Sequence, residues 1–489
     1  MLTETANGVS RSVSFSFWPR VREFAVPPSM IETATARRRV GDWAGACAAA
    51  GIDVDFNPRS VARAHGRELA ARLRADLRQL APDLLRWHMP RIAPDGLLRP
   101  GLTVVLARYE GGAGPHGPGG EGPRGDGSGS VRLVVRTPPA WADAGQRISL
   151  ALWDGSLAEA GARRHPHPRP DRRFRLDLHR HLWDARRTDE LRIRSGASSG
   201  TNSPSHAGRW SADPAVLERV PPERRRAVDR WAAEAGILLR AEGRSAGAFR
   251  VRLGARRWLD LELVADGNGG GPPPVLRIAA PERTGQAPAP PLLPEASTWV
   301  LPDLELLRAG AIDVDRLHPL VASALVPDHT PSTGPARIPE PAGAPRLVEC
   351  RGARHRIGLV DGVLAALDHD PVEIRREELL ATLTGTPLAC LRAIDEAHRS
   401  PDCLPGVRER LDHGDAAGAL AVVEGLLGPD ALLRDGALRD ELEAAARRRI
   451  VYGLFRAGMV GPGPRSGRTM PHGRRPRGHR SHPRDTSTR

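Results

Sequence analysis

The chain has 489 residues, enough for two or three domains, and 40% of them are hydrophobic. All 72 basic residues are arginine, and the formal net charge is +14. The lack of lysine excludes Walker-type phosphate loops, Schiff-base and pyridoxal enzymes, and protein kinases, because each of these needs a lysine.

The cysteines predict no disulfide framework and no structural zinc site, because they are far apart and contain no Cys-x-x-Cys pair. They are Cys47, Cys350, Cys390 and Cys403. Residues 1–16 lack the pattern of a signal peptide, and no apolar run is long enough for a membrane span. We therefore expect a reduced, soluble, cytoplasmic protein that has no cofactor and is purified without a stoichiometric transition metal.

The first third of the chain predicts helices followed by an antiparallel sheet. Alternation over residues 12–18 indicates a short strand, and residues 29–50 indicate two helices joined by a turn. Asn57-Pro58 is typical of a helix start, and an amphipathic pattern follows to Leu80. Three strands are then expected, with a Gly/Pro/Ser-rich insertion between the first two: 102–109, 131–137 and 147–153.

A similar order recurs later. Helices beginning at Asp213 and Pro221 precede three further strands, 248–253, 258–264 and 275–280, with a Gly/Pro-rich loop before the last. The repeated order of helix, strand, Gly-rich loop and strand predicts two α+β units, which either share a sheet or form one each.

The region from Leu347 to Met459 predicts a helical bundle. Asp370 is the expected N-cap of a helix with Pro371 in its first turn. The last helix is expected from 436 to 457, closed by Gly458. Its apolar residues recur every four positions and predict one stripe: Leu438, Leu442, Ala446, Ile450 and Leu454.

Together these patterns predict the α+β class, with antiparallel meanders in the N-terminal region, a C-terminal helical bundle and a disordered basic tail. The expected segments are an α+β unit (1–160), a basic His-rich linker (161–212), a second α+β unit (213–300), a Pro-rich linker (301–345), a helical domain (346–460) and an Arg-rich tail (461–489).

The candidate metal ligands in the sequence are Asp177, His179 and His181. If residues 173–183 form a strand, these three side chains share one face and could ligate Zn²⁺ or Fe²⁺. Arg173 and Arg175 would lie on the same face and repel a cation, so a solvated polar strand face is the competing interpretation.

Three Asp-His pairs, at 328–329, 368–369 and 412–413, invite comparison with metal-dependent phosphohydrolases. The structural alternative is stronger, because Asp370 already serves as an N-cap and His413 lies at a helix C-terminus beside Gly414. No Gly-x-Ser-x-Gly elbow is present.

The tail from Gly461 to Arg489 has eight arginines and one aspartate, so it carries 8 − 1 = +7, half of the net charge. Such a segment can bind phosphates by counterion release. The candidate contacts are Arg474, Arg475, Arg477, Arg480 and Arg484. No aromatic residue is interleaved, so base stacking is not predicted.

Three short segments of the sequence resemble an uncharacterised actinobacterial protein family: residues 24–28, 83–88 and 452–458. The resemblance implies a bacterial cytoplasmic protein and assigns no activity. We expect a non-enzymatic protein–protein interaction or adaptor protein with an unidentified protein partner and no membrane association. The alternatives are an accessory protein that binds nucleic acid through its tail, and a metal-dependent hydrolase.

Overall fold

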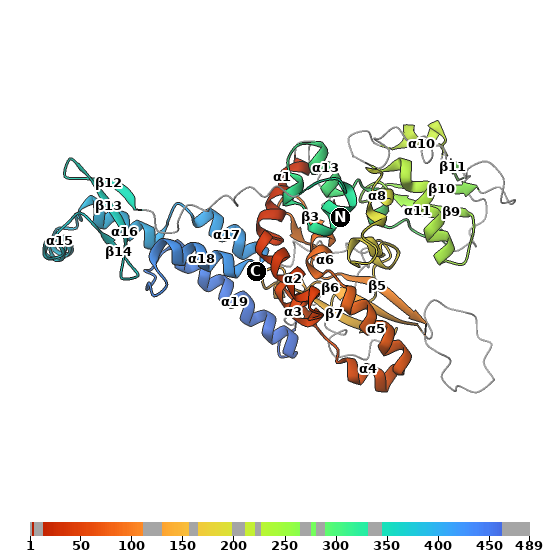
Figure 1. Cartoon of the computed structure of the whole chain (residues 1–489), viewed down its shortest axis with the longest axis horizontal. Coiled ribbons are helices and arrows are strands. Elements are labelled where there is room, and N and C mark those ends of the chain that lie inside the picture. The colour runs from red at the N-terminus through yellow and green to blue at the C-terminus, as the bar shows by residue number, and fades with distance from the viewer. Residues whose placement is uncertain are drawn as a thin grey trace, which may run out of the picture. The chain divides into compact units, whose positions relative to one another are not determined.

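The computed structural model describes residues 2–3, 13–110, 130–155, 165–197, 211–220, 226–264, 275–279, 289–330 and 345–461. The chain divides into two compact units. Unit 1 contains Met1–Trp141, Arg147–Pro331 and Gly461–Arg489, and unit 2 contains Ala142–Gln146 and Ser332–Val460. The predicted fold class is confirmed, with antiparallel sheets in the N-terminal region and helices in the C-terminal region (Figure 1).

Unit 1 begins with helices. The strand expected over residues 12–18 is wrong, because α1 (Val13–Arg20) covers this segment and continues into a π-helical turn (Val21–Ala25). Phe17, Trp18 and Val21 are buried, so helical spacing places the apolar residues in the core. The predicted helical pair is confirmed as α2 (Pro28–Arg39) and α3 (Trp43–Ala49), with Asp42 capping α3 through its bond to the Gly45 amide.

The first sheet of unit 1 has the order β2-β7-β6-β5. Its strands are β2 (Ile52–Val54), β5 (Thr103–Glu110), β6 (Ser130–Arg136) and β7 (Ile148–Trp153). β2 pairs in parallel with β7, and the other pairs are antiparallel. Three helices follow β2 in the chain and contribute buried apolar residues to the same core: α4 (Pro58–His65), α5 (Arg67–Gln79) and α6 (Pro82–His88). A small sheet joins β1 (Leu2–Thr3), β3 (Arg91–Ile92) and β4 (Leu97–Leu98).

The second sheet of unit 1 repeats this topology. Its order is β8-β11-β10-β9, with β8 parallel to β11 and the remaining pairs antiparallel. The strands are β8 (Ser211–Ala212), β9 (Gly247–Arg252), β10 (Trp258–Val264) and β11 (Val275–Ile278), and α10 (Pro214–Arg219) and α11 (Val228–Ala241) lie between the first two. The two α+β units therefore have separate sheets and separate cores.

Several short elements complete unit 1. They are 3₁₀ turns at Ala140–Ala142, Leu176–Leu178, Arg180–Leu182 and Val314–Arg316, and the helices α8 (Glu190–Arg194), α12 (Glu295–Thr298), α13 (Pro302–Arg308) and α14 (Pro319–Leu325). Leu304, Leu306 and Val321 are buried in the first core. The part of the predicted linker from 301 to 330 is thus a packed segment of unit 1.

Unit 2 begins with an antiparallel sheet of β12 (Arg346–Cys350), β13 (Ala353–Val360) and β14 (Val363–Ala366). The expectation of a helical block from Leu347 is wrong at this point. The expected helices follow: α15 (Pro371–Thr384), α16 (Ala389–Arg399), α17 (Leu404–His413), α18 (Ala416–Leu427) and α19 (Ala437–Ala457). Figure 1 shows α17, α18 and α19 side by side, and buried residues of these helices share one core.

The apolar stripe predicted on α19 is only partly buried. Leu438 is fully buried, whereas Ile450 is 62% exposed. Four residues advance more than one helical turn, so three such steps rotate the stripe by about 120° away from its starting face. Tyr452 is buried in place of Ile450. No helix in the described part of the chain is long and apolar enough to cross a bilayer.

Candidate functional site

The predicted metal ligands Asp177, His179 and His181 do not form an open face. Their segment consists of two 3₁₀ turns rather than the expected strand. The Asp177 carboxylate accepts hydrogen bonds from Arg175 and lies 2.9 Å from Arg108 Nε. Both of its oxygens are therefore held by guanidinium groups.

The two histidines of this segment are buried in a hydrogen-bonded network. His179 Nε2 lies 3.0 Å from Glu234 Oε2 and 2.8 Å from Ser297 Oγ, while its Nδ1 contacts the Arg175 carbonyl at 2.9 Å. A catalytic Ser-His-acid triad uses different ring nitrogens for the serine and the acid. In this protein His179 Nε2 contacts both the serine hydroxyl and the glutamate carboxylate, so the arrangement is not that of a triad. All three side chains are also buried.

His181 and Glu234 both favour the deprotonated form in this network, which leaves His181 neutral and Glu234 negatively charged. Burial lowers the pKa of His181 well below its usual value, with a further contribution from Arg194, whose Nη1 lies 3.0 Å from His181 Nδ1. Burial opposes ionisation of Glu234, but His179 and Arg194 outweigh it and hold the pKa of Glu234 well below its usual value. The Asp177 carboxylate, both ring nitrogens of His179 and Nδ1 of His181 are thus already engaged.

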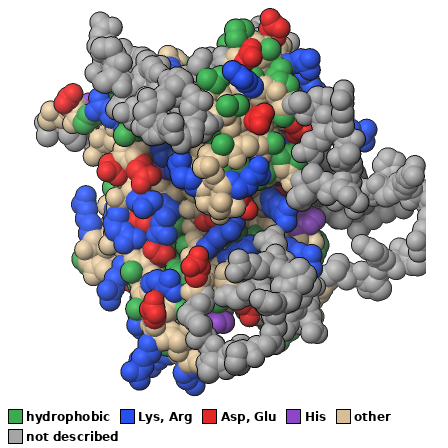
Figure 2. All heavy atoms as spheres, turned by 90° about the vertical axis from the view of Figure 1, so that its right-hand side faces the viewer, with side chains coloured by type: hydrophobic (Ala, Val, Ile, Leu, Met, Phe, Trp, Pro, Cys, Tyr) green, Lys and Arg blue, Asp and Glu red, His purple; other side chains and the backbone are tan. Residues whose placement is uncertain are grey.

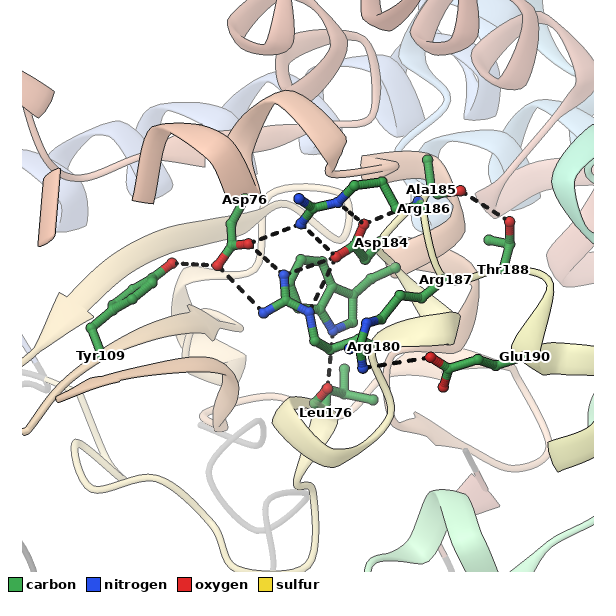
Figure 3. A network of polar contacts seen from close by, with 11 residues as sticks. Asp76, Tyr109, Leu176, Arg180, Asp184, Ala185, Arg186, Arg187, Thr188 and Glu190 are labelled. Atoms are coloured by element: carbon green, nitrogen blue, oxygen red, sulfur yellow. Dashed lines mark hydrogen bonds and ion pairs between the residues drawn. The ribbon is translucent and has the colours of Figure 1, made fainter. Parts of the chain in front are cut away.

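The same segment is fixed to the first sheet by a second network (Figure 3). Asp184 is fully buried and accepts hydrogen bonds from Arg180 and Arg186. The same two arginines also bind Asp76 of α5, which accepts a hydrogen bond from Tyr109 at 2.9 Å. The region predicted as a basic linker, from 165 to 197, is therefore a structural part of unit 1.

Arginines on one face of unit 1 lie beside acidic side chains. Figure 2 shows arginine side chains beside Asp and Glu over the visible part of the face that carries β9 and β10. Arg250 pairs with Asp260 and Arg252 pairs with Glu295 in this region. This mixture of charges does not form the uniform basic face that nucleic acid would favour.

The Asp-His pairs are explained by local structure. Asp370 accepts a hydrogen bond from the Val372 amide, which confirms it as the N-cap of α15. His329 lies 2.7 Å from Asp315, and Asp368 binds Arg356. These pairs do not assemble into one constellation.

A cluster of potential soft-metal ligands lies in unit 2. Cys350 ends β12, His369 follows β14, and Cys390 lies in the first turn of α16. One ligand atom from each of the three residues lies within 4.8 Å of the others. Cys390 Sγ lies 3.5 Å from His369 Nε2.

This Cys/His cluster is not visible in the sequence. Its members are separated by 18 and 20 residues, so no short spacing motif reveals them. Sheet pairing and the packing of α16 on β12 bring them together. Burial raises the pKa of Cys390 to about 11 and that of Cys47 to about 12, which makes both thiols poor nucleophiles at neutral pH.

The α15 helix presents apolar side chains to solvent. None of its 14 residues is buried, and Val372, Leu379 and Leu383 are 54%, 68% and 84% exposed. These three residues are spaced by seven and four positions, so they lie along one side of the helix. We call them the α15 stripe.

The α15 stripe is flanked by Arg375 and Arg376. Both are exposed, and neither has an ion pair within the described segments. By contrast, Glu373 and Glu377 on another side of α15 bind Arg351. The stripe therefore combines exposed apolar area with two arginines that form no ion pair in the described structure.

No family model, curated protein or solved structure matches this chain. Functional assignment therefore depends on the residues themselves. The predicted phosphate contacts Arg474, Arg475, Arg477, Arg480 and Arg484 lie outside the described residues.

Proposed function

We propose that the chain is a non-enzymatic interaction protein that binds an acidic amphipathic helix of a partner protein along the α15 stripe. The observation that carries the proposal is the exposure of Val372, Leu379 and Leu383 on a helix that buries none of its own residues. Exposed contiguous apolar residues of this kind are typical of protein interaction sites.

The stripe has the spacing that helix-in-groove and paired-helix recognition use. Apolar residues separated by seven and four positions meet one face of a second helix over about three turns. Burial of each side chain contributes on the order of 1–2 kcal/mol, because each starts only partly exposed. Three such side chains supply about 3–6 kcal/mol, part of which offsets the entropy lost on association.

The two flanking arginines specify the chemistry of the partner. A partner helix with Asp or Glu beside its apolar stripe would pair with Arg375 and Arg376, whereas a basic helix would be repelled. Rim charges of this kind act mainly on the association rate and on orientation.

The enzymatic alternatives have less support. His179 and His181 are engaged in buried networks, and Cys47 and Cys390 are buried thiols with raised pKa values. The tail remains a candidate for binding nucleic acid through its +7 charge.

The test compares the full chain with the double variant Leu379→Glu/Leu383→Glu and with Leu432→Glu. Leu432 is a suitable control because it is an exposed leucine of the same unit, 89% exposed, and lies outside α15. Proteins that co-purify with the wild type and with Leu432→Glu, but not with the double variant, would be identified, produced and titrated in pure form.

We expect the identified partner to bind the double variant at least about 10-fold more weakly than the wild type and the control. The reason is that two exposed leucines, which the partner would cover, are replaced by charges that repel an acidic helix. A partner that binds the double variant equally well would overturn the proposal. So would co-purifying proteins that do not differ between the double variant and the control.

A further inference from the structure

We propose that unit 2 binds one Zn²⁺ ion through Sγ of Cys350, Nε2 of His369 and Sγ of Cys390, with the imidazole of His355 as the fourth ligand. This inference goes beyond the proposed docking function and does not depend on it. It departs from the expectation of a metal-free protein, which was based on the spacing of the cysteines in the sequence.

The positions of the three first ligands suit tetrahedral zinc. With Zn–S near 2.3 Å and Zn–N near 2.0–2.1 Å, the S···N edge of a tetrahedral site is about 3.6 Å and the S···S edge about 3.8 Å. The measured Cys390 Sγ to His369 Nε2 distance is 3.5 Å, and all three ligand atoms lie within 4.8 Å of one another. Shifts of an ångström or less would therefore complete the geometry.

The donor set selects zinc on chemical grounds. Two thiolates and an imidazole are soft and borderline ligands, which favour Zn²⁺ over Mg²⁺ or Ca²⁺. Two thiolates also neutralise the ion, so the buried site would carry no net charge. Cys350 and Cys390 are 1% and 0% exposed, which shields the site from solvent.

Two arginines of the surrounding hairpin are neutralised by acidic residues. Arg351 binds Glu373 and Glu377, and Arg356 binds Asp368. This differs from the His-rich segment of unit 1, where guanidinium groups bind the candidate ligand atoms themselves.

A carboxylate also lies behind the metal-facing imidazole. His369 Nδ1 is 4.0 Å from Glu373 Oε2, one helical turn further along the chain. A carboxylate on the outer nitrogen is a common partner of a metal-bound histidine, because it fixes the tautomer that leaves the other nitrogen free for the metal. This separation is longer than a hydrogen bond, so Glu373 would orient His369 after a further approach of about 1 Å, without touching the ion.

His355 is placed to supply the fourth ligand. It lies on β13 opposite Val348 of β12, so its side chain and that of Cys350 share one face of the sheet. Its ring stacks on His369 with centroids 4.2 Å apart, and its buried Nδ1 has no hydrogen-bond partner. Parallel rings cannot both direct a nitrogen at one ion, so zinc binding requires the His355 ring to rotate out of the stack.

The small core around the cluster gives the ion a structural purpose. Among the described residues of this core, Cys350, Ile357, Cys390 and Ile394 are buried, and two of these are proposed ligands. Small lobes with so little buried area commonly depend on a metal or a disulfide. Zinc would join β12, α16 and the segment before α15. It would thereby fix the N-terminal end of the helix that carries the α15 stripe.

The test uses the full chain, purified under reducing conditions with a tag that contains no histidine. Zinc is measured per chain by mass spectrometry after gel filtration, for the wild type and for Cys390→Ser, His369→Ala and the control Cys403→Ser. Cys403 is a suitable control because it is a partly buried cysteine of the same unit outside the cluster. Cobalt titration of the metal-free protein, followed by visible absorption, reports whether the bound ion is tetrahedral and ligated by thiolate.

We expect about one zinc ion per chain in the wild type and in Cys403→Ser, and loss of zinc in Cys390→Ser and His369→Ala. Removal of zinc from the wild type should also lower the melting temperature followed by circular dichroism, because the ion binds only the folded lobe. His355→Ala should retain thiolate-to-cobalt absorption but lower zinc affinity by about 10-fold or more, as measured against a competing chelator.

Three outcomes would overturn the assignment. These are a wild-type chain that binds no zinc even after reconstitution, zinc that persists in both Cys390→Ser and His369→Ala, or a Cys350–Cys390 disulfide in the reduced preparation. If His355→Ala leaves zinc affinity and the cobalt spectrum unchanged, His355 is not a ligand. The cobalt spectrum of the wild type remains informative where a variant fails to fold.

Discussion

The substitution Asp184→Asn should destabilise unit 1 strongly. Asp184 is fully buried, and its carboxylate accepts bonds from Arg180 at 2.8 and 3.1 Å and from Arg186 at 3.1 and 3.2 Å. Removing one charge of a buried pair costs about 3–5 kcal/mol. In the variant, Arg180 keeps Asp76 as a partner, and Arg186 is half-exposed, so its lost ion pair costs little. We therefore expect the free energy of unfolding to fall by about 3 kcal/mol, the lower end of this range.

Tryptophan fluorescence in urea can follow unit 1 alone. All ten tryptophans lie between residues 18 and 299, and unit 2 contains none of them. With a denaturant slope of about 3 kcal/mol/M, a loss of about 3 kcal/mol lowers the midpoint by about 1 M urea. The control Asp189→Asn removes an exposed carboxylate that has no ion pair among the described residues, and should change stability by less than about 0.5 kcal/mol.

The pH dependence gives a second measurement of the same network. Burial opposes ionisation of Asp184, but hydrogen bonds from Arg186 and Arg180 outweigh it and hold the pKa of Asp184 below its usual value. A carboxylate with a lowered folded-state pKa stabilises the protein above its unfolded pKa, about 4, and loses this contribution as pH falls through the folded pKa. The difference between wild type and Asp184→Asn should therefore be largest near pH 7 and shrink below about pH 4. Equal midpoints for Asp184→Asn and Asp189→Asn at pH 7 would refute a stabilising role for the network.

Three further predictions address the other sites. The double variant Arg375→Glu/Arg376→Glu should weaken binding of an acidic partner helix by about 10-fold at low salt and by less at high salt, as measured by titration. His179→Gln should lower the urea midpoint of unit 1, because it disrupts a buried hydrogen-bond network, and should leave the zinc content unchanged. A chain that ends at Val460 should lose any affinity for nucleic acid that the full chain shows. In the full chain, that affinity should fall steeply with salt and show no sequence preference; equal binding by the shortened chain would exclude the tail.

Sequence patterns predict the helices and strands of this chain well where each element forms locally. Asn57, Asp213 and Asp370 all cap helices as their residue types indicate, and Gly458 closes α19 in the left-handed conformation. The meander strands also lie within one or two residues of their expected bounds. Capping and alternation depend on neighbouring residues, so they can be recognised without knowledge of the fold.

The misinterpreted elements are those that tertiary contacts determine. The alternation over 173–183 is compatible with a strand, but only the single bridge from Val105 to Arg175 offers this segment a partner, and it folds into 3₁₀ turns around buried polar groups. The apolar residues of β12–β14 form strands that pack on α16 rather than extending the bundle.

The α15 stripe and the Cys/His cluster could not be predicted from the sequence, for different reasons. The leucines of α15 have helical spacing, and nothing in that spacing distinguishes a buried face from the exposed one that the structure has. The Cys/His cluster unites residues from a strand end, a loop and a helix start, and only the packing of these elements makes them neighbours. Charged networks such as that of Asp76 and Asp184 likewise depend on long-range contacts.

The most direct test of the docking function is a titration of the identified partner against the full chain and the Leu379→Glu/Leu383→Glu variant, with Leu432→Glu as the control. We expect the dissociation constant to rise by about 10-fold or more for the double variant and to stay unchanged for the control, since only the former removes apolar area from the α15 stripe. The same dissociation constant for all three proteins, with each of them folded by circular dichroism, would contradict the assignment of α15 as the binding surface.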